Sequence, residues 1–292
     1  FIGRQGSLEV LHQHRTRGDR LVTILGPPGV GKTRLALRYG ELHGASFLSA
    51  WFCDLTEART VLDVCAAVSR ALGVALQSEG DRERGAIDFI ASTLAEAGPL
   101  LLILDNVEQV ARITADVLET WIAVASEAFV LVTSRERLGL ASEVVVDLMP
   151  LELPPPHASS TPNGQKSEAL LLYEERARSA GGWDDSTMAD AAALVRELEG
   201  IPLAIELAAA RSRVLGADKL LARLANAKKL DVGPARGSSR GRGAARHATL
   251  RAAIDSSWEM LSEVERAALA QAPTFAGEVS IEAIEAILDV PD

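Results

Sequence analysis

The stretch from Leu21 to Tyr39, LVTILGPPGVGKTRLALRY, constrains the fold more than any other part of the chain. Leu21–Leu25 is a short apolar run of the kind that forms a buried strand. Gly26–Thr33 then matches the pattern G-x-x-x-x-G-K-S/T, and the apolar residues that follow recur at helical spacing. A strand, a glycine-rich loop and a helix in this order predict a P-loop, which binds the phosphates of a nucleotide.

The residue types of this loop suit phosphate binding. Gly26, Gly29 and Gly31 allow the backbone to approach phosphate oxygens and to direct several N–H groups toward them. The helix N-terminus adds partial positive charge, Lys32 can reach the β- and γ-phosphates, and the hydroxyl of Thr33 can ligate Mg²⁺. The other residues predicted to contact the nucleotide from this segment are Pro27, Pro28, Val30 and Arg34.

A second candidate site residue, Asp105, follows the apolar run Leu100–Leu104, which predicts a parallel strand covered on both faces. A carboxylate at such a strand end can hold Mg²⁺ together with Thr33. The alternative is that Asp105 caps the next helix. The following residue, Asn106, cannot accept a proton at neutral pH, so we expect slow hydrolysis, with Glu108 as the only nearby carboxylate that could act as a base.

Arg135 lies at the end of another apolar run, 129–133. Because strand ends on one side of an open α/β sheet converge on the ligand, Arg135 is predicted to contact the γ-phosphate and so to report whether ATP or ADP is bound. The alternative reading of the same residues is a capping box, Thr133–Glu136, that opens a short helix. The predicted catalytic residues are therefore Lys32, Asp105, Glu108 and Arg135.

Strand and helix patterns alternate through residues 1–150, which predicts a three-layer α/β domain with a parallel sheet. Beyond a proline-rich break at 153–156 the strand signals stop, and residues 151–228 are predicted to form a small helical domain. Residues 229–247 are low in complexity and basic, which predicts a flexible linker. The strand candidates are 21–25, 47–55, 100–104, 129–133 and 144–148, and the helix candidates are 7–14, 61–72, 87–94, 117–124, 169–177, 188–198, 202–210, 219–224, 250–261, 263–270 and 281–288.

Composition excludes several classes of protein. A formal net charge of −10 argues against direct binding of nucleic acid over a general surface. Two cysteines, Cys53 and Cys65, are too few for a disulfide framework or a zinc site. Without an apolar run of about 18 residues or a leader pattern, we expect no membrane association and a cytoplasmic location.

Taken together, these residues resemble the STAND class of P-loop ATPases, which includes the NB-ARC switch proteins. The match looks closest to the ATPase module of bacterial multidomain transcriptional regulators of the SARP and large LuxR types. The matching segments are FIGR at 1–4, GPPGVGKTRLA at 26–36, LLILDNVE at 101–108, VLVTSRERL at 130–138, GIPLAIELAAAR at 200–211 and ATLRAAIDSSWEMLSEVE at 248–265.

The resemblance implies a winged-helix domain at 248–292, incomplete here, which together with the other two domains closes over ADP in the resting state. It places Arg4 beside the adenine, Pro202 against the nucleotide from the helical domain, and Arg135 as the first sensor. The chain departs from the class at Gln5, where Glu is usual, and at Asp255–Trp258, which stands in place of Asp-Trp-Ser-Tyr.

These expectations combine into a switch that binds ATP or ADP with Mg²⁺, hydrolyses ATP slowly, self-associates in the ATP state and controls a regulator through sensor and effector domains outside this fragment. One rival is an AAA-type motor, which predicts fast turnover. A second is a P-loop kinase, which needs an acceptor pocket and a basic lid. A third is a nucleotide-bound scaffold that never hydrolyses ATP.

Overall fold

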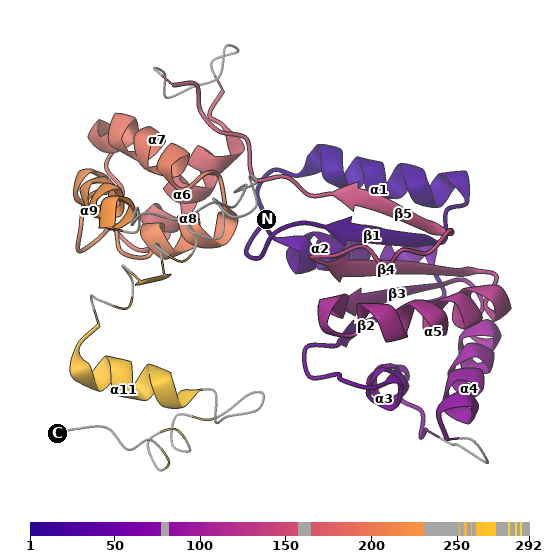
Figure 1. The fold of residues 1–292 in the computed structure, drawn as a ribbon. Helices are drawn as coiled ribbons and strands as arrows, with labels where there is room; N and C mark the ends of the chain where they lie inside the picture. The colour runs from indigo at the N-terminus through magenta and orange to yellow at the C-terminus, as the bar shows by residue number, and fades with distance from the viewer. Residues whose placement is uncertain are drawn as a thin grey trace, which may run out of the picture. The chain divides into compact units, whose positions relative to one another are not determined.

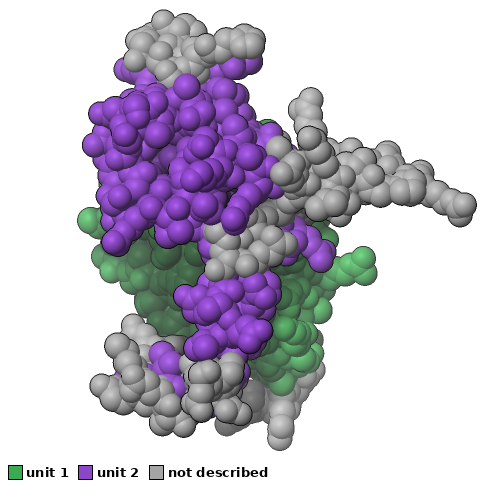
Figure 2. Space-filling model, turned by 90° about the vertical axis from the view of Figure 1, so that its left-hand side faces the viewer, with its two compact units in different colours: residues 1–151 green, residues 152–292 purple. Residues whose placement is uncertain are grey.

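The computed structural model describes residues 1–76, 82–156 and 165–230, the segment 261–272, and a few single residues elsewhere after position 250. The chain divides into two compact units, Phe1–Leu151 and Glu152–Asp292, which are coloured separately in Figure 2. Among the helices of these described segments, none is both long and apolar enough to cross a membrane.

The first unit is built on a sheet of five parallel strands in the order β2-β3-β4-β1-β5 (Figure 1). This confirms the predicted α/β fold with a parallel sheet. Because every strand runs in the same direction, the carboxyl ends lie along one edge, where Leu25 is beside Ser134 and Asp54 is beside Asp105. The strands are β1 (Leu21–Leu25), β2 (Ser49–Asp54), β3 (Leu100–Asp105), β4 (Ala128–Ser134) and β5 (Glu143–Asp147).

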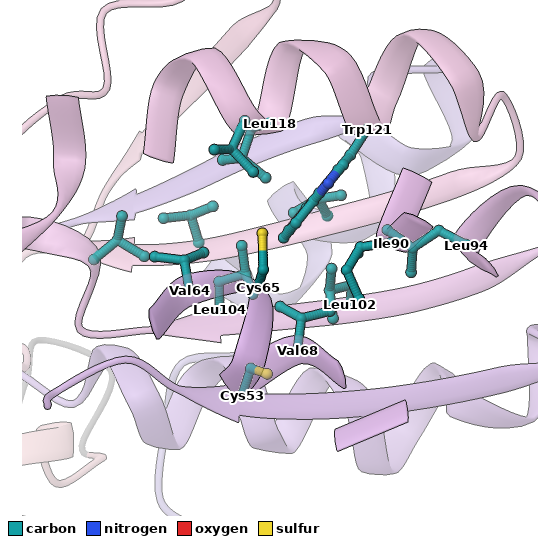
Figure 3. Close-up of a cluster of buried hydrophobic side chains, with 14 of the residues drawn as sticks. Cys53, Val64, Cys65, Val68, Ile90, Leu94, Leu102, Leu104, Leu118 and Trp121 are labelled. Atoms are coloured by element: carbon teal, nitrogen blue, oxygen red, sulfur yellow. The ribbon is translucent and has the colours of Figure 1, made fainter. Parts of the chain in front are cut away.

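Helices cover both faces of this sheet because its central strands are apolar on both sides. In β3, Leu102 and Leu104 pack with α3, α4 and α5, whereas Leu101 and Ile103 pack with α1 and α2. Figure 3 shows the first of these two clusters around Trp121. The helices are α1 (Gln5–Arg17), α2 (Lys32–His43), α3 (Val61–Leu72), α4 (Arg82–Glu96) and α5 (Ala111–Val124).

In the second unit, the elements described between residues 165 and 230 are helices, as the loss of strand signals predicted. Between α7 and α8 the backbone turns at Glu199 and Gly200, which both have positive φ, and Pro202 then occupies the first turn of α8. The helices are α6 (Glu168–Ser179), α7 (Met188–Glu197), α8 (Pro202–Ala209), α9 (Ala217–Leu230) and α11 (Glu263–Gln271). Most of the predicted linker and winged-helix region lies outside the described residues.

The predicted elements are all found where the structure describes them, but several bounds differ. Helix α9 extends to Leu230 and so reaches into the segment predicted to be a linker. Strand β2 begins two residues later than predicted because Phe47 ends a 3-10 turn at Gly44–Ser46, where its N–H donates to the carbonyl oxygen of Gly44 at 3.0 Å. Helices were predicted too short where their ends are polar, since periodicity marks only the buried stripe. These are α1, α4 and α9; helix α5 also begins earlier than predicted, at Ala111, although that end includes buried residues.

Candidate nucleotide-binding site

The predicted P-loop connects β1 to α2 and is folded tightly against the end of β5. A Cβ on Gly26 would come within 2.9 Å of the carbonyl oxygen of Leu148, so only glycine fits there. Gly31 has a φ of 95°, in the left-handed region that glycine tolerates. The Nζ of Lys32 donates to the carbonyl oxygens of Gly26, at 3.0 Å, and Pro27, at 3.2 Å. The loop therefore has the strand, turn and helix geometry that the motif predicted.

Lys32 is buried, and it lies within electrostatic reach of the other predicted catalytic residues. Burial lowers the pKa of Lys32, the charge of Arg135 lowers it further, and the carboxylates of Glu108 and Asp105 oppose the shift. The structure thus brings together the four side chains that the sequence singled out on three different segments. Phosphate oxygens at this position would favour the charged form of the lysine.

Asp105 is 3% exposed and is oriented by hydroxyl groups from two other segments. The Oγ1 of Thr33 donates to both carboxylate oxygens, at 2.8 and 3.0 Å, and the Oγ1 of Thr133 donates to Oδ1 at 2.5 Å. Burial raises the pKa of Asp105, while these two hydrogen bonds and the charge of Lys32 oppose the rise. The alternative role of Asp105 as a helix cap is wrong, because the residue that precedes the next helical turn is Asn106.

The same carboxylate and hydroxyl suit a magnesium ion. Mg²⁺ prefers oxygen ligands and retains several waters, so two protein oxygens on one side of the ion are sufficient. The hydroxyl of Thr33 and the carboxylate of Asp105 are such a pair, and their contact brings both to one point at the start of α2. They are the residues that would hold the ion.

Asn106 is part of a hydrogen-bond chain that the sequence did not reveal. It has a positive φ of 60°, its backbone N–H donates to Thr133 Oγ1 at 3.1 Å, and its Nδ2 donates to Thr56 Oγ1 at 2.8 Å. Thr56 Oγ1 in turn donates to Asp54 Oδ1 at 2.5 Å. The sequence did contain a signal for this contact, since polar residues lie at the end of β2. The carboxyl ends of parallel strands share one edge of the sheet, so such residues are expected to lie near Asn106.

Glu108 and Arg135 form an ion pair across the ends of β3 and β4. The Nε of Arg135 lies 2.8 Å from Oε1 of Glu108, and the side chain of Glu108 is 13% exposed against 48% for Arg135. The Oε2 of Glu108 is buried without a hydrogen-bond partner among the described residues. The alternative capping box is wrong: no helix follows β4 at 135–140, and Ser134 Oγ accepts the N–H of Glu136 at 3.0 Å.

The remaining predicted site residues lie in different surroundings. Arg4 donates from Nη1 to the carbonyl oxygen of Met149 and from Nη2 to that of Val30, at 3.0 Å, so it ties the N-terminal segment to the P-loop. The side chain of Val30 is fully buried in the core, and Arg34 is exposed on α2. Pro27 and Pro28 are partly exposed in the loop. Pro202 belongs to the second unit, where it opens α8.

Comparison with known proteins places this site in a family. The profile of a family described as AAA domain matches residues 14–135, a segment that includes the P-loop, Asp105 and Arg135. The uncharacterized protein Rv0894 of Mycobacterium tuberculosis is 34% identical over 98% of this chain, which spans 68% of that protein. The chain belongs to the P-loop ATPases and carries an AAA domain over residues 14–135. This confirms the resemblance that the ordered motifs predicted.

Two further relatives are longer than this chain. Rv0890c of Mycobacterium tuberculosis, provisionally named an HTH-type transcriptional regulator, is 32% identical over 92% of this chain, which covers 28% of that protein. A solved STAND protein with a tetratricopeptide repeat sensor, from Pyrococcus horikoshii, has a TM-score of 0.58 and 17% identity over 98% of this P-loop ATPase chain and 36% of its own. The likeness to the solved structure shows a shared fold.

Proposed function

We propose that this P-loop ATPase is a nucleotide-operated switch, in which bound ADP or ATP selects between two arrangements of a longer protein. The observation that carries the proposal is the set of groups gathered around Lys32: Asp105 with its two hydroxyl donors, and the Glu108–Arg135 ion pair. Lys32 and the Asp105 cluster suit phosphate and magnesium, and Arg135 is the group that can distinguish a terminal phosphate from a diphosphate.

The proposed binding roles follow from the positions of the side chains. Lys32 exchanges its loop carbonyls for the β- and γ-phosphates, Thr33 and Asp105 hold Mg²⁺, and Arg135 contacts the γ-phosphate. When bound, Mg²⁺ neutralises phosphate charge. Arg4 stands beside the adenine, and Pro202 contacts the nucleotide from the helical domain; both roles are taken from the resemblance to NB-ARC proteins.

Hydrolysis is proposed to be slow. Asn106, which occupies the position directly after Asp105, is not a base, and its amide is already bonded to Thr56 and to Asp105 Oδ2, at 3.3 Å. Glu108, the other carboxylate that acts on the charge of Lys32, is paired with Arg135. A switch needs its ATP state to last, so a low rate of turnover serves it.

The regulatory role is supported by the names of the relatives. One curated relative carries a transcriptional-regulator name, and the solved STAND structure carries a repeat sensor. By analogy, this ATPase module would pass a signal from a sensor domain to an effector domain in the cytoplasm, by self-association in the ATP state. Moving a population from 1:99 to 99:1 requires about 5.5 kcal/mol of differential binding, which a γ-phosphate held by several charged groups can supply.

An AAA-type motor is the second candidate, because the matching family profile is an AAA domain. A motor would turn over ATP at about one per second or faster, within the usual range for enzymes. We expect the switch to hydrolyse ATP at least about tenfold more slowly than a motor does. Steady-state hydrolysis by the purified chain separates the two candidates.

The nucleotide site itself is tested with Lys32→Ala and a matched control, Lys219→Ala, on the exposed face of α9. Binding of ATP and ADP is measured by titration with fluorescent nucleotides, and nucleotide released on denaturing the purified protein is identified by chromatography. Loss of the Lys32 side chain should weaken binding by about a hundredfold, whereas the control should bind as the parent does. Unchanged binding by Lys32→Ala would refute the site.

A further inference from the structure

The ion pair between Glu108 and Arg135 is asymmetric. The guanidinium of Arg135 contacts one oxygen of Glu108, at 2.8 Å, while Oε2 of the same carboxylate is buried without a hydrogen-bond partner among the described residues. Arginine can bind both oxygens of a carboxylate in parallel, and a buried carboxylate oxygen without a partner is unfavourable. Arg135 therefore binds one of the two carboxylate oxygens of Glu108, although a guanidinium could bind both.

The two members of the pair differ in exposure, and both act on the charge of Lys32. Arg135 has an exposed side-chain fraction of 48%, so it can rotate, whereas Glu108 at 13% is enclosed. Both act on the charge of Lys32, with opposite sign, so both lie within reach of the lysine that binds the terminal phosphate. A group with more negative charge placed beside Lys32 would compete with Glu108 for Arg135.

We propose that Glu108 and the γ-phosphate compete for the guanidinium of Arg135, so that the ion pair is a gate on both ATP preference and hydrolysis. This inference rests on the proposed nucleotide site. ADP has no γ-phosphate and leaves the pair intact. ATP draws Arg135 away, and the carboxylate of Glu108 is then released at the point where water can attack.

The released carboxylate acts as the base. The water oxygen forms a bond to the γ-phosphorus, the bond from that phosphorus to the bridging oxygen of ADP breaks, and Glu108 takes the water proton. The products are ADP and inorganic phosphate; Glu108 passes the proton to solvent, and the return of Arg135 to the ionised Glu108 restores the pair. Hydrolysis in this scheme requires that Arg135 first leave Glu108, so the ion pair adds a step before the base can act.

The test uses the whole chain with Glu108→Gln, Arg135→Gln, the double variant, and Glu119→Gln on the exposed face of α5 as a control. Dissociation constants for ATP and ADP are measured for each, together with single-turnover hydrolysis. Removing the competing charge of Glu108 should raise the preference for ATP over ADP by about tenfold, because the arginine is no longer withheld. It should also slow hydrolysis by about a hundredfold, the usual contribution of a general base.

The other variants make the test specific. Arg135→Gln should reduce the ATP preference below that of the parent, and the double variant should match it, because Glu108 acts on binding only through Arg135. A structural ion pair would instead give equal losses of ATP and ADP affinity, and an unchanged or lower ATP preference in Glu108→Gln would overturn the gate. If Lys32→Ala still abolishes binding in that case, the nucleotide site stands and only the gate falls. If the parent binds neither nucleotide, both proposals fall.

Discussion

Thr133 is the residue whose replacement tests the arrangement of this site most directly. It is fully buried, and its hydroxyl donates to Asp105 Oδ1 at 2.5 Å. The hydroxyl oxygen, Thr133 Oγ1, also accepts the backbone N–H of Asn106 at 3.1 Å. Valine has nearly the same shape but cannot donate or accept. Thr133→Val therefore removes a hydrogen bond to a carboxylate and leaves a backbone N–H without its acceptor.

The expected loss follows from these two bonds. A hydrogen bond to a charged group contributes about 1.5–3 kcal/mol, and an unpaired buried donor costs about 1–3 kcal/mol. The additional apolar methyl recovers about 0.8 kcal/mol. We expect Thr133→Val to lower the free energy of unfolding by about 2–5 kcal/mol, and Thr133→Ser, which keeps the hydroxyl and loses one methyl, by about 1 kcal/mol.

Urea titration measures this difference. In a background with Trp183 and Trp258 replaced by phenylalanine, tryptophan fluorescence comes only from Trp51 and Trp121, which lie in the first unit. The free energies of unfolding are compared between variants whose dependence on urea concentration has the same slope. If Thr133→Val were no less stable than Thr133→Ser, the hydroxyl would contribute nothing and the reasoning would be refuted.

The same variant has a predictable dependence on pH. Burial raises the pKa of Asp105, and the hydrogen bond from Thr133 opposes that rise, so the valine variant should raise the pKa further. A carboxyl whose folded pKa is raised contributes stability below its unfolded value and loses it as pH rises through the folded pKa. The stability gap between parent and variant should be smaller in acid, where only the unpaired N–H of Asn106 contributes, and should widen with pH; a gap constant from about pH 4 to pH 8 would contradict this.

Three other predictions concern metal binding, thiol reactivity and the core. Thr33→Val should weaken binding of Mg·ATP by about tenfold or more while Thr33→Ser does not, and the difference should vanish in EDTA. Burial raises the pKa of Cys53 to about 12 and of Cys65 to about 11, so alkylation of the folded chain by iodoacetamide near pH 8 should be about a hundredfold slower than for the urea-unfolded chain. Trp121→Phe loses buried volume and the 3.1 Å bond from Nε1 to the carbonyl of Ile87, which should cost about 2–3 kcal/mol in urea unfolding of the first unit.

The sequence predicted those parts of the site that are contiguous. To identify the P-loop at Gly26–Thr33, one needs only the motif, a strand before it and a helix after it, and all three are local signals. Asp105 was found because it ends an apolar run. The contact between Asp105 and Thr133 depends on something that no local pattern contains, which is that β4 lies between β1 and β3. Strand order is decided by packing of the whole sheet.

The capping box predicted at Thr133–Glu136 shows how a local pattern can be overridden. A threonine followed three residues later by glutamate can start a helix because its hydroxyl accepts a backbone N–H. Here the hydroxyl of Thr133 donates to Asp105 and accepts the N–H of Asn106, so it is already used. A buried carboxylate is the stronger partner, and the segment after β4 remains without a helix.

The charges of the site explain why both magnesium and the proposed gate are needed. Lys32 and Arg135 are opposed by Asp105 and Glu108, so the local charges cancel before any ligand is considered. A triphosphate carries several negative charges and would meet two carboxylates as well as two cations. Magnesium at Asp105 offsets one carboxylate, and transfer of Arg135 from Glu108 to phosphate makes the second cation available. ADP can bind with magnesium at Asp105, but it has no terminal phosphate to draw Arg135 away from Glu108. A switch can use that difference to separate ADP from ATP.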